Sequence, residues 1–390
     1  MPYKIKFERP PAGIAVNSAR CGENVAVQRV EFTSSEDGQV FIHRLETIVD
    51  SILKSLEPQV SFRRSEIDHL LAFIEADGNA IVYVNELRRI DCIRINRPCE
   101  QGEAIFKSDI VDYKRVSFDG ITVPDTAGVV YLFSAGWRKG LFFDFSQIGH
   151  EPQPRRFDCE TLFGQFYGYV LFQERFAITE HDWSTLLAEK WFPFAALPHE
   201  LIDELLRQIR AGWDSDEVLQ RIANNVRSRV DELISGWRGY SVFAPHLEIL
   251  ERAIERFKSD DFVSCAGLLY PRIEGILRSN LRSVRPMAKP TQTRLSESAV
   301  VTIRDNQRSL LLPHRFQQYL EQVYFAGFDP ASEENDISRN SVAHGVADAG
   351  AFSRKAAVIA ILIVHQLYYS LGSDVSSPTS DRNQDDIAVS

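Results

Sequence analysis

The sequence predicts an α+β protein with an N-terminal domain of mixed helices and strands, a helical middle region and an all-helical C-terminal bundle. Within residues 1–150, helical patterns come first and runs of strand-like residues follow them. Beyond residue 156, apolar residues repeat at helical spacing almost to the end of the chain. Helices followed by strands, without a regular alternation of the two, favour an α+β fold over a doubly wound sheet.

The N-terminal domain, residues 1–150, is expected to begin with an irregular arm, because residues 1 to about 36 show few periodic signals. We then expect helices over residues 40–56 and Glu66–Glu75, and strands over Ala80–Val84, Ile90–Ile95, Val129–Phe133 and Leu141–Phe145. The segment 134–140 predicts a hairpin connection between the last two strands. The proline- and charge-rich stretch Gly149–Arg156 predicts the end of the domain.

The middle region, residues 151–240, is expected to be helical and to end near Gly236–Tyr240. Its predicted helices are Glu160–Arg175, Glu180–Glu189, Glu200–Ala211 and Asp216–Ile234. The bundle, residues 243–372, has predicted helices over Pro245–Phe257, Asp261–Leu281, Ser309–Phe325 and Phe352–Leu371, and a short helical turn over Ser338–Ala343. The long connection 282–308 is typical of functional or mobile loops. The polar composition of residues 373–390 predicts a disordered tail.

Composition excludes several classes of protein. A formal net charge of −10 argues against a general basic coat for nucleic acid, although one basic surface can still exist locally. The five cysteines are odd in number and form no CxxC pair, so we expect reduced thiols and no zinc ribbon. The N-terminus lacks an apolar signal core, and the longest apolar run, Ala356–Val364, is too short to span a bilayer. We therefore expect a cytoplasmic protein that needs no membrane, metal or cofactor.

One short segment, Arg339-Asn340-Ser341-Val342-Ala343-His344-Gly345, suggests chemistry. An arginine and a histidine at this spacing arise about twice by chance in such a chain, so the context decides. Of the Arg/His pairs in the sequence, only this one has Asn after the arginine and Gly after the histidine. It also lies between an amphipathic helix and the strongly apolar final helix.

The segment resembles the Arg-x4-His motif of the HEPN family of ribonucleases. The earlier stretch 268–278 is also similar to the family helix that supplies a polar residue to the same cleft, which points to Glu274. The resemblance covers about one third of the chain, the bundle from residue 243 to 372. It implies that Arg339, His344, Asn340 and Glu274 form the active site.

These residue types suit RNA cleavage without a metal ion. Histidine titrates near neutrality, so His344 can take the proton from the 2′-hydroxyl or return one to the leaving oxygen. The guanidinium of Arg339 stays charged and offers paired donors to a phosphate that gains charge in the transition state. Asn340 can orient the phosphate or the imidazole, and Gly345 lets a substrate backbone approach closely.

The spacing of the pair sets a geometric condition. Five residues at about 100° each leave Arg339 and His344 about 140° apart on a regular helix. Either the helix is interrupted near Gly345, or a second copy of the chain completes the site. Family members commonly dimerise with their motifs facing each other, so the resemblance implies a homodimer.

A basic segment accompanies the motif. Residues 270–315 contain nine basic and three acidic residues, a local charge of +6 in an acidic protein. Such a segment is what a phosphate-binding surface requires. The residues expected to bind RNA are Arg272, Arg278, Arg282, Arg285 and Lys289.

The function expected from the sequence is a metal-independent endoribonuclease, as in toxin and phage-defence proteins that carry such a bundle. Residues 1–240 would then sense a trigger or hold a protein partner. Three structural interpretations stay open: Arg339 capping a carboxylate, His344 as a core histidine, and Glu274 paired with Arg272 or Arg278 on a solvated face. The alternative functions are a catalytically silent HEPN-like interaction module, and an RNA- or nucleotide-binding protein that does not cleave.

Overall fold

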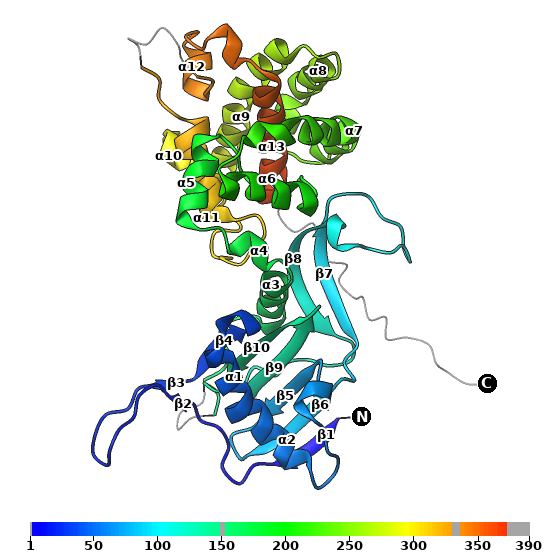
Figure 1. The fold of residues 1–390 in the computed structure, drawn as a ribbon, viewed down its shortest axis with the longest axis vertical. Coiled ribbons are helices and arrows are strands. Elements are labelled where there is room, and N and C mark those ends of the chain that lie inside the picture. Colours follow the sequence, from blue (N-terminus) through cyan, green and yellow to red (C-terminus); the bar gives the residue numbers. More distant parts are fainter. Residues whose placement is uncertain (1, 149–152, 330–335, 373–390) are drawn as a thin grey trace, which may run out of the picture. The chain divides into compact units, whose positions relative to one another are not determined.

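The computed structural model describes residues 2–148, 153–329 and 336–372, and the chain forms two compact units. The first comprises Met1–Ile178 and Arg308–Leu310, and the second comprises Thr179–Gln307 and Leu311–Ser390. The first is rich in strands and the second is helical, so the predicted α+β class is confirmed (Figure 1). The predicted tail 373–390 lies outside the described residues.

The first unit is built on a six-stranded antiparallel sheet. Its strands, in spatial order, are β1 (Tyr3–Lys6), β6 (Asn79–Val84), β5 (Leu70–Ile74), β9 (Gly128–Ala135), β10 (Arg138–Asp144) and β4 (Val30–Ser34). Two further strand pairs are β2 (Ile14–Ala15) with β3 (Val27–Gln28), and β7 (Arg89–Ile95) with β8 (Ile110–Phe118). Strands β9 and β10 form the predicted hairpin, with Ala135 opposite Arg138.

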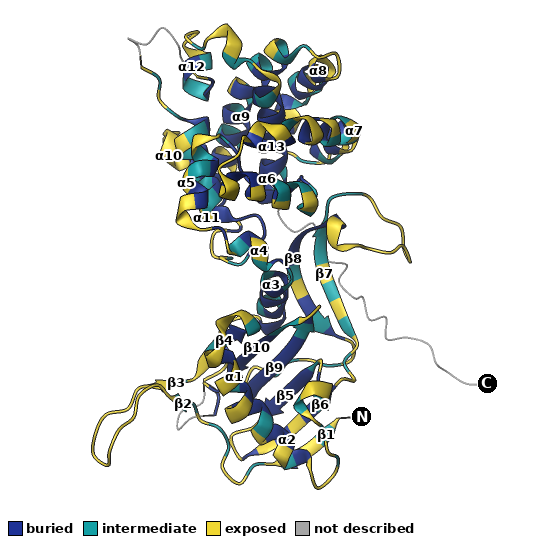
Figure 2. Ribbon diagram, viewed as in Figure 1, coloured by how far each residue is buried: buried dark blue, intermediate teal, exposed yellow. Residues whose placement is uncertain are grey.

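Apolar side chains cover both faces of this sheet. Its central strands β5, β9 and β10 are mostly buried (Figure 2). On one face lie α1 (Gln39–Arg44), a π-helical turn (Leu45–Val49) and α2 (Asp50–Leu56), which together fill the helix predicted over 40–56. On the other face lie α3 (Cys159–Leu171) and the β7–β8 pair, with a core rich in aromatic rings. A short helix, α4 (Gln173–Phe176), follows α3.

One predicted helix of this unit was wrong. The helix expected over Glu66–Glu75 is replaced by β5, whose five residues are all buried between β6 and β9. A strand buried on both faces reads as a continuous apolar run, which periodicity does not separate from a buried helix. Residues 1–36, which were expected to include an irregular arm, contain the short strands β1 to β4 and, between them, residues 7–13 and 16–26 without helix or strand.

The chain enters the first unit a second time at Arg308–Leu310. The buried carboxylate of Asp112 accepts hydrogen bonds from Ser309 Oγ at 2.9 Å and from the Leu310 backbone N at 3.0 Å. Leu310 belongs to the aromatic core beside α3, and the Arg308 guanidinium lies 4.9 Å from the ring centre of Phe166. Three residues are thus part of the core of the first unit.

The second unit is a helical bundle around the apolar helix α13 (Arg354–Leu371). A helix that is apolar on all sides must be buried, and most residues of α13 are. The other helices are α5 (Glu180–Ala188), α6 (His199–Ala211), α7 (Leu219–Arg238), α8 (Leu247–Lys258), α9 (Phe262–Val284), α10 (Gln292–Ser298), α11 (Pro313–Tyr319) and α12 (Arg339–Ala343). Among the described helices, none is long and apolar enough to cross a bilayer.

The region expected over 151–240 is divided between the two units. Helices α3 and α4 belong to the first unit, whereas α5, α6 and α7 belong to the second, where α7 packs on α8 and α13. Helix boundaries otherwise follow the predictions, with two changes. The helix expected over 309–325 begins at Pro313 and continues through a π-helical turn, Leu320–Tyr324, and the connection 282–308 contains α10.

Candidate functional site

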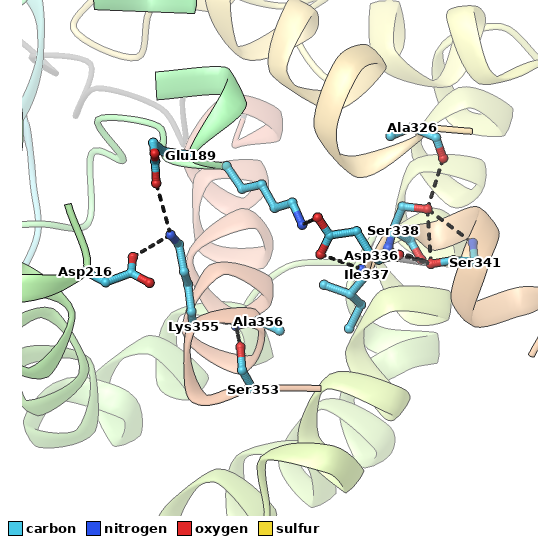
Figure 3. A network of polar contacts seen from close by, with 11 residues as sticks. Glu189, Asp216, Ala326, Asp336, Ile337, Ser338, Ser341, Ser353, Lys355 and Ala356 are labelled. Carbon is cyan, nitrogen blue, oxygen red and sulfur yellow. Dashed lines mark hydrogen bonds and ion pairs between the residues drawn. The ribbon is translucent and has the colours of Figure 1, made fainter. Parts of the chain in front are cut away.

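Helix α12, which carries the Arg339–His344 segment, is fixed at its first turn by two buried serines. Ser338 Oγ accepts a hydrogen bond from the Ser341 backbone N at 3.1 Å and donates one to the Ala326 carbonyl at 2.9 Å (Figure 3). Ser341 Oγ in turn donates to the Asp336 carbonyl at 2.7 Å. Such a capping arrangement satisfies the free donors of the first turn, so this five-residue helix starts at a defined position.

Arg339 forms an ion pair with Glu274, which projects from α9. Glu274 is only 6% exposed and also accepts a hydrogen bond from Arg278 Nε at 2.6 Å. One buried carboxylate therefore holds two guanidinium groups. The pairing expected between Glu274 and Arg278 is present, but Glu274 is buried rather than on a solvated face.

Asn340 is held by backbone and side-chain partners. Its Nδ2 donates to the carbonyls of Phe325 and Ala326 at 2.9 and 3.2 Å, and its Oδ1 accepts from Gln292 Nε2 at 2.9 Å. Arg339 Nη1 also donates to this Oδ1, at 3.1 Å. Because both ends of the amide are engaged within the protein, Asn340 positions Arg339.

His344 directly follows the last helical residue, and its backbone N donates to the Asn340 carbonyl at 3.1 Å. Gly345 has φ +69°, a left-handed conformation that favours glycine and ends the helix. An interruption near Gly345 was one of the two alternatives expected from the spacing, but the helix ends only after His344, whose backbone is still helical. The side chain of His344 is exposed, and its ring lies 5.2 Å from the Phe328 ring. The core-histidine interpretation was therefore wrong.

The structure brings Arg339, Asn340, Glu274 and Arg278 into direct contact and places His344 at the end of the same short helix. This arrangement puts an exposed imidazole at the end of the same short helix as a guanidinium whose position is set by a buried anion. Arg339 uses only part of its five N–H donors in its contacts with Glu274 and Asn340. Chemically, the group can bind a phosphate and exchange a proton with it.

The other basic residues expected to bind RNA differ in their surroundings. Arg272 turns toward His246, with Nη1 at 3.4 Å from the ring Nδ1, and Arg285 lies 3.6 Å from the Glu297 carboxylate. Arg282 and Lys289 are exposed. Among the five predicted residues, Arg278 alone shares the carboxylate of the candidate site.

Several residues near the site were not predicted. Tyr324 is buried, and its hydroxyl donates to the Tyr270 carbonyl at 2.6 Å; burial and the neighbouring Glu274 raise its pKa. Burial and Arg272 lower the pKa of His246, whose Nε2 lies 3.0 Å from Ser279 Oγ. None of these residues belongs to a local motif, because each reaches the site through tertiary packing.

Among residues 2–148, 153–329 and 336–372, no group of three His, Cys, Asp or Glu side chains is placed to hold a metal ion. Comparison of the chain with protein-family models, with curated proteins and with solved structures finds no match in any of the three. Functional interpretation therefore rests on the residues of the site.

Proposed function

We propose that this protein is a metal-independent endoribonuclease of the HEPN type, with Arg339 and His344 as its reacting residues. The observation that carries the proposal is the short capped helix α12, which presents an exposed imidazole at its end and a guanidinium held by the buried Glu274 at its start. Rigid placement of both groups is what general acid–base catalysis with charge stabilisation requires.

The proposed step is attack of a ribose 2′-oxygen on the adjacent phosphorus. The new P–O bond forms as the bond to the 5′-oxygen of the next nucleotide breaks, leaving a 2′,3′-cyclic phosphate and a free 5′-hydroxyl. One proton leaves the 2′-hydroxyl and one reaches the 5′-oxygen, and His344 serves in one of these transfers. Arg339 stabilises the charge that gathers on the phosphate oxygens.

A second copy of the chain is part of the proposal. His344 is one imidazole, whereas the reaction moves two protons, so a facing site on a second copy would supply the other group. The exposed Arg282 and Lys289 add positive charge along α9 and the loop after it, where an RNA backbone is expected. A homodimer that binds RNA is the assembly we propose, with residues 1–240 as the part that responds to a trigger or a protein partner.

A catalytically silent module is the second candidate, and one observation favours it. The Arg339–Glu274 ion pair is also the contact that a purely structural arginine makes with a buried carboxylate. The two candidates differ in what happens when the imidazole is removed, because His344 is exposed and its ring neighbour, Phe328, is only half-buried.

The deciding experiment incubates the purified full-length protein with total RNA in EDTA. We expect cleavage products with 2′,3′-cyclic phosphate ends, and a loss of about 10²- to 10⁴-fold in the His344→Ala variant. His314→Ala, which removes another exposed histidine of the second unit, is the control and should cleave normally. Activity that EDTA abolishes and magnesium restores, or normal cleavage by His344→Ala, would contradict the proposal.

A further inference from the structure

A small pocket adjoins the candidate site through the ring of Phe328. The pocket has a volume of about 140 Å³, and Phe328, Val323 and Ile337 give it apolar walls. Phe328 is also the residue whose ring lies 5.2 Å from the ring of His344. A group bound in this pocket would therefore be one aromatic ring away from the proposed reacting histidine. We call it the Phe328 pocket.

An ion pair between Lys190 and Asp336 lines the same pocket. Lys190 follows α5 with a left-handed backbone, φ +61°, and its carbonyl accepts a hydrogen bond from Tyr319 at 2.9 Å. Asp336 Oδ1 accepts from the Ile337 backbone N at 3.2 Å. Both backbones are thus held by their neighbours, and an ammonium and a carboxylate stand side by side beside an aromatic wall.

This pairing of charges matches one nucleobase better than the others. The Watson–Crick edge of guanine presents an acceptor, O6, next to two N–H donors on N1 and N2. An ammonium can donate to O6 while the two oxygens of a carboxylate accept from the two donors. Adenine and cytosine offer the carboxylate a single amino group, and uracil places its one N–H between two oxygens. The aromatic wall suits a base that stacks, as unpaired RNA bases do on protein rings.

We propose that the Phe328 pocket binds a guanine base of single-stranded RNA next to the phosphate that is cleaved. Asp336 accepts from N1 and N2 of the base, Lys190 donates to O6, and Phe328 stacks on the ring. That the bound guanine belongs to the substrate rests on the proposed ribonuclease function. Whether the pocket binds guanine can be tested by binding alone.

The test measures the affinity of guanosine, inosine and adenosine 3′-monophosphates for the full-length protein by titration calorimetry. Inosine lacks only the N2 amino group, so guanosine should bind about 10-fold more tightly than inosine. Asp336→Asn should bring the two affinities to within about twofold. Lys190→Met removes the donor to O6, which both bases carry, and should weaken both while keeping their ratio.

Lys355→Met is the matched control. Lys355 pairs with Asp216 and Glu189 (Figure 3). It lines a second cavity of about 260 Å³, which shares Lys190 and Asp336 with the Phe328 pocket, but Lys355 itself does not line the Phe328 pocket. This variant should bind all three nucleotides as the wild type does. The melting temperature of each variant is also measured, so that affinities are compared only between folded proteins. Equal binding of the three nucleotides by the wild type, or an unchanged preference in Asp336→Asn, would overturn the proposal.

A second arm uses adenosine-rich RNA oligonucleotides that contain one guanosine or one inosine. Cleavage next to guanosine, and weaker cleavage next to inosine, is the expected result. Guanosine-selective binding without any cleavage would refute the ribonuclease function and leave the pocket standing. Cleavage without base preference, together with equal nucleotide affinities, would refute the guanine pocket and leave the ribonuclease function standing. Selective binding of the free nucleotide with no effect of guanosine on cleavage would overturn the assignment of the base to the substrate.

Discussion

His365, in the middle of α13, should make the free energy of unfolding depend on pH. Burial, with a smaller contribution from Arg229, lowers its pKa from 6.5 to about 3. Its Nδ1 accepts a hydrogen bond from Trp237 Nε1 at 3.0 Å, so the neutral ring carries its proton on Nε2. That buried nitrogen has no hydrogen-bond partner among the described residues, and a second proton would add an unsolvated charge.

The sign and size of the effect follow from the two pKa values. The unfolded chain takes up a proton on this histidine near pH 6.5, whereas the folded protein does so only near 3. Stability is therefore fully present above pH 6.5 and is lost as the pH falls toward 3. Between about pH 7.5 and about pH 5, the loss amounts to about 2 kcal/mol for this one group.

The assay is urea unfolding followed by tryptophan fluorescence and circular dichroism at those two pH values. His365→Gln keeps an acceptor for Trp237 but does not titrate, so its free energy of unfolding should fall by about 2 kcal/mol less than that of the wild type. His314→Gln, at an exposed position, is the control and should behave as the wild type. Equal losses in the wild type and His365→Gln would refute the reasoning.

Three further predictions concern α12 and its carboxylate. Arg339→Lys should still bind RNA but cleave it at least about 10²-fold more slowly, because the charge remains and the paired donors are lost; normal cleavage would make the arginine structural. Glu274→Gln should lower the free energy of unfolding, measured by thermal or urea unfolding, by about 1–3 kcal/mol, because two guanidinium groups lose their charged acceptor. Arg278→Gln should lower it less, because Arg339 keeps Glu274 as its partner. Ser341→Ala should cost about 1 kcal/mol of stability, because the Ser338 backbone N and the Asp336 carbonyl lose their hydrogen bonds to Ser341 Oγ at the first turn of α12. It should reduce cleavage more than RNA binding in single-turnover assays, and unchanged cleavage would show that these hydrogen bonds do not position the site.

How much of the fold was predictable depended on how each element is buried. Strands β9 and β10 were predicted because apolar runs flank a glycine-containing turn. Strand β5 was not, because both of its faces are covered and its residues show no alternation. The helices of the second unit were predicted from their apolar stripes, but the sequence did not predict that α5, α6 and α7 belong to the same unit as the C-terminal helices. Periodicity shows which face of a helix is buried and says nothing about the helix that buries it.

Part of the candidate site was predictable from the sequence and part of it was not. Arg339, Asn340 and His344 lie within one short segment, so their placement on one helix follows from the sequence. The helical period left two alternatives open, an interruption near Gly345 or a second copy of the chain, and the helix ends at Gly345 only after His344. Asp336 lies close to this segment in the chain, but Lys190 is far from it in sequence. No local pattern links the two, and only the packing of α5 against the chain before α12 brings them together.

The tripeptide Arg308–Leu310 has a consequence for how the protein can be divided. A gene fragment ending at Ile178 would encode the whole sheet but not Ser309 and Leu310, leaving the buried Asp112 carboxylate without those two donors. Asp112 would keep its ion pair with Lys114, at 3.5 Å, but the loss of two hydrogen bonds to a buried carboxylate is costly. The vacated place of Leu310 would add a cavity in the aromatic core. The chain passes from one unit to the other at three peptide bonds, so a single proteolytic nick leaves the pieces joined. The first unit cannot be encoded by one continuous part of the gene without the second, so the two units have to be expressed together. Neither unit can be exchanged for another domain by a single cut in the gene.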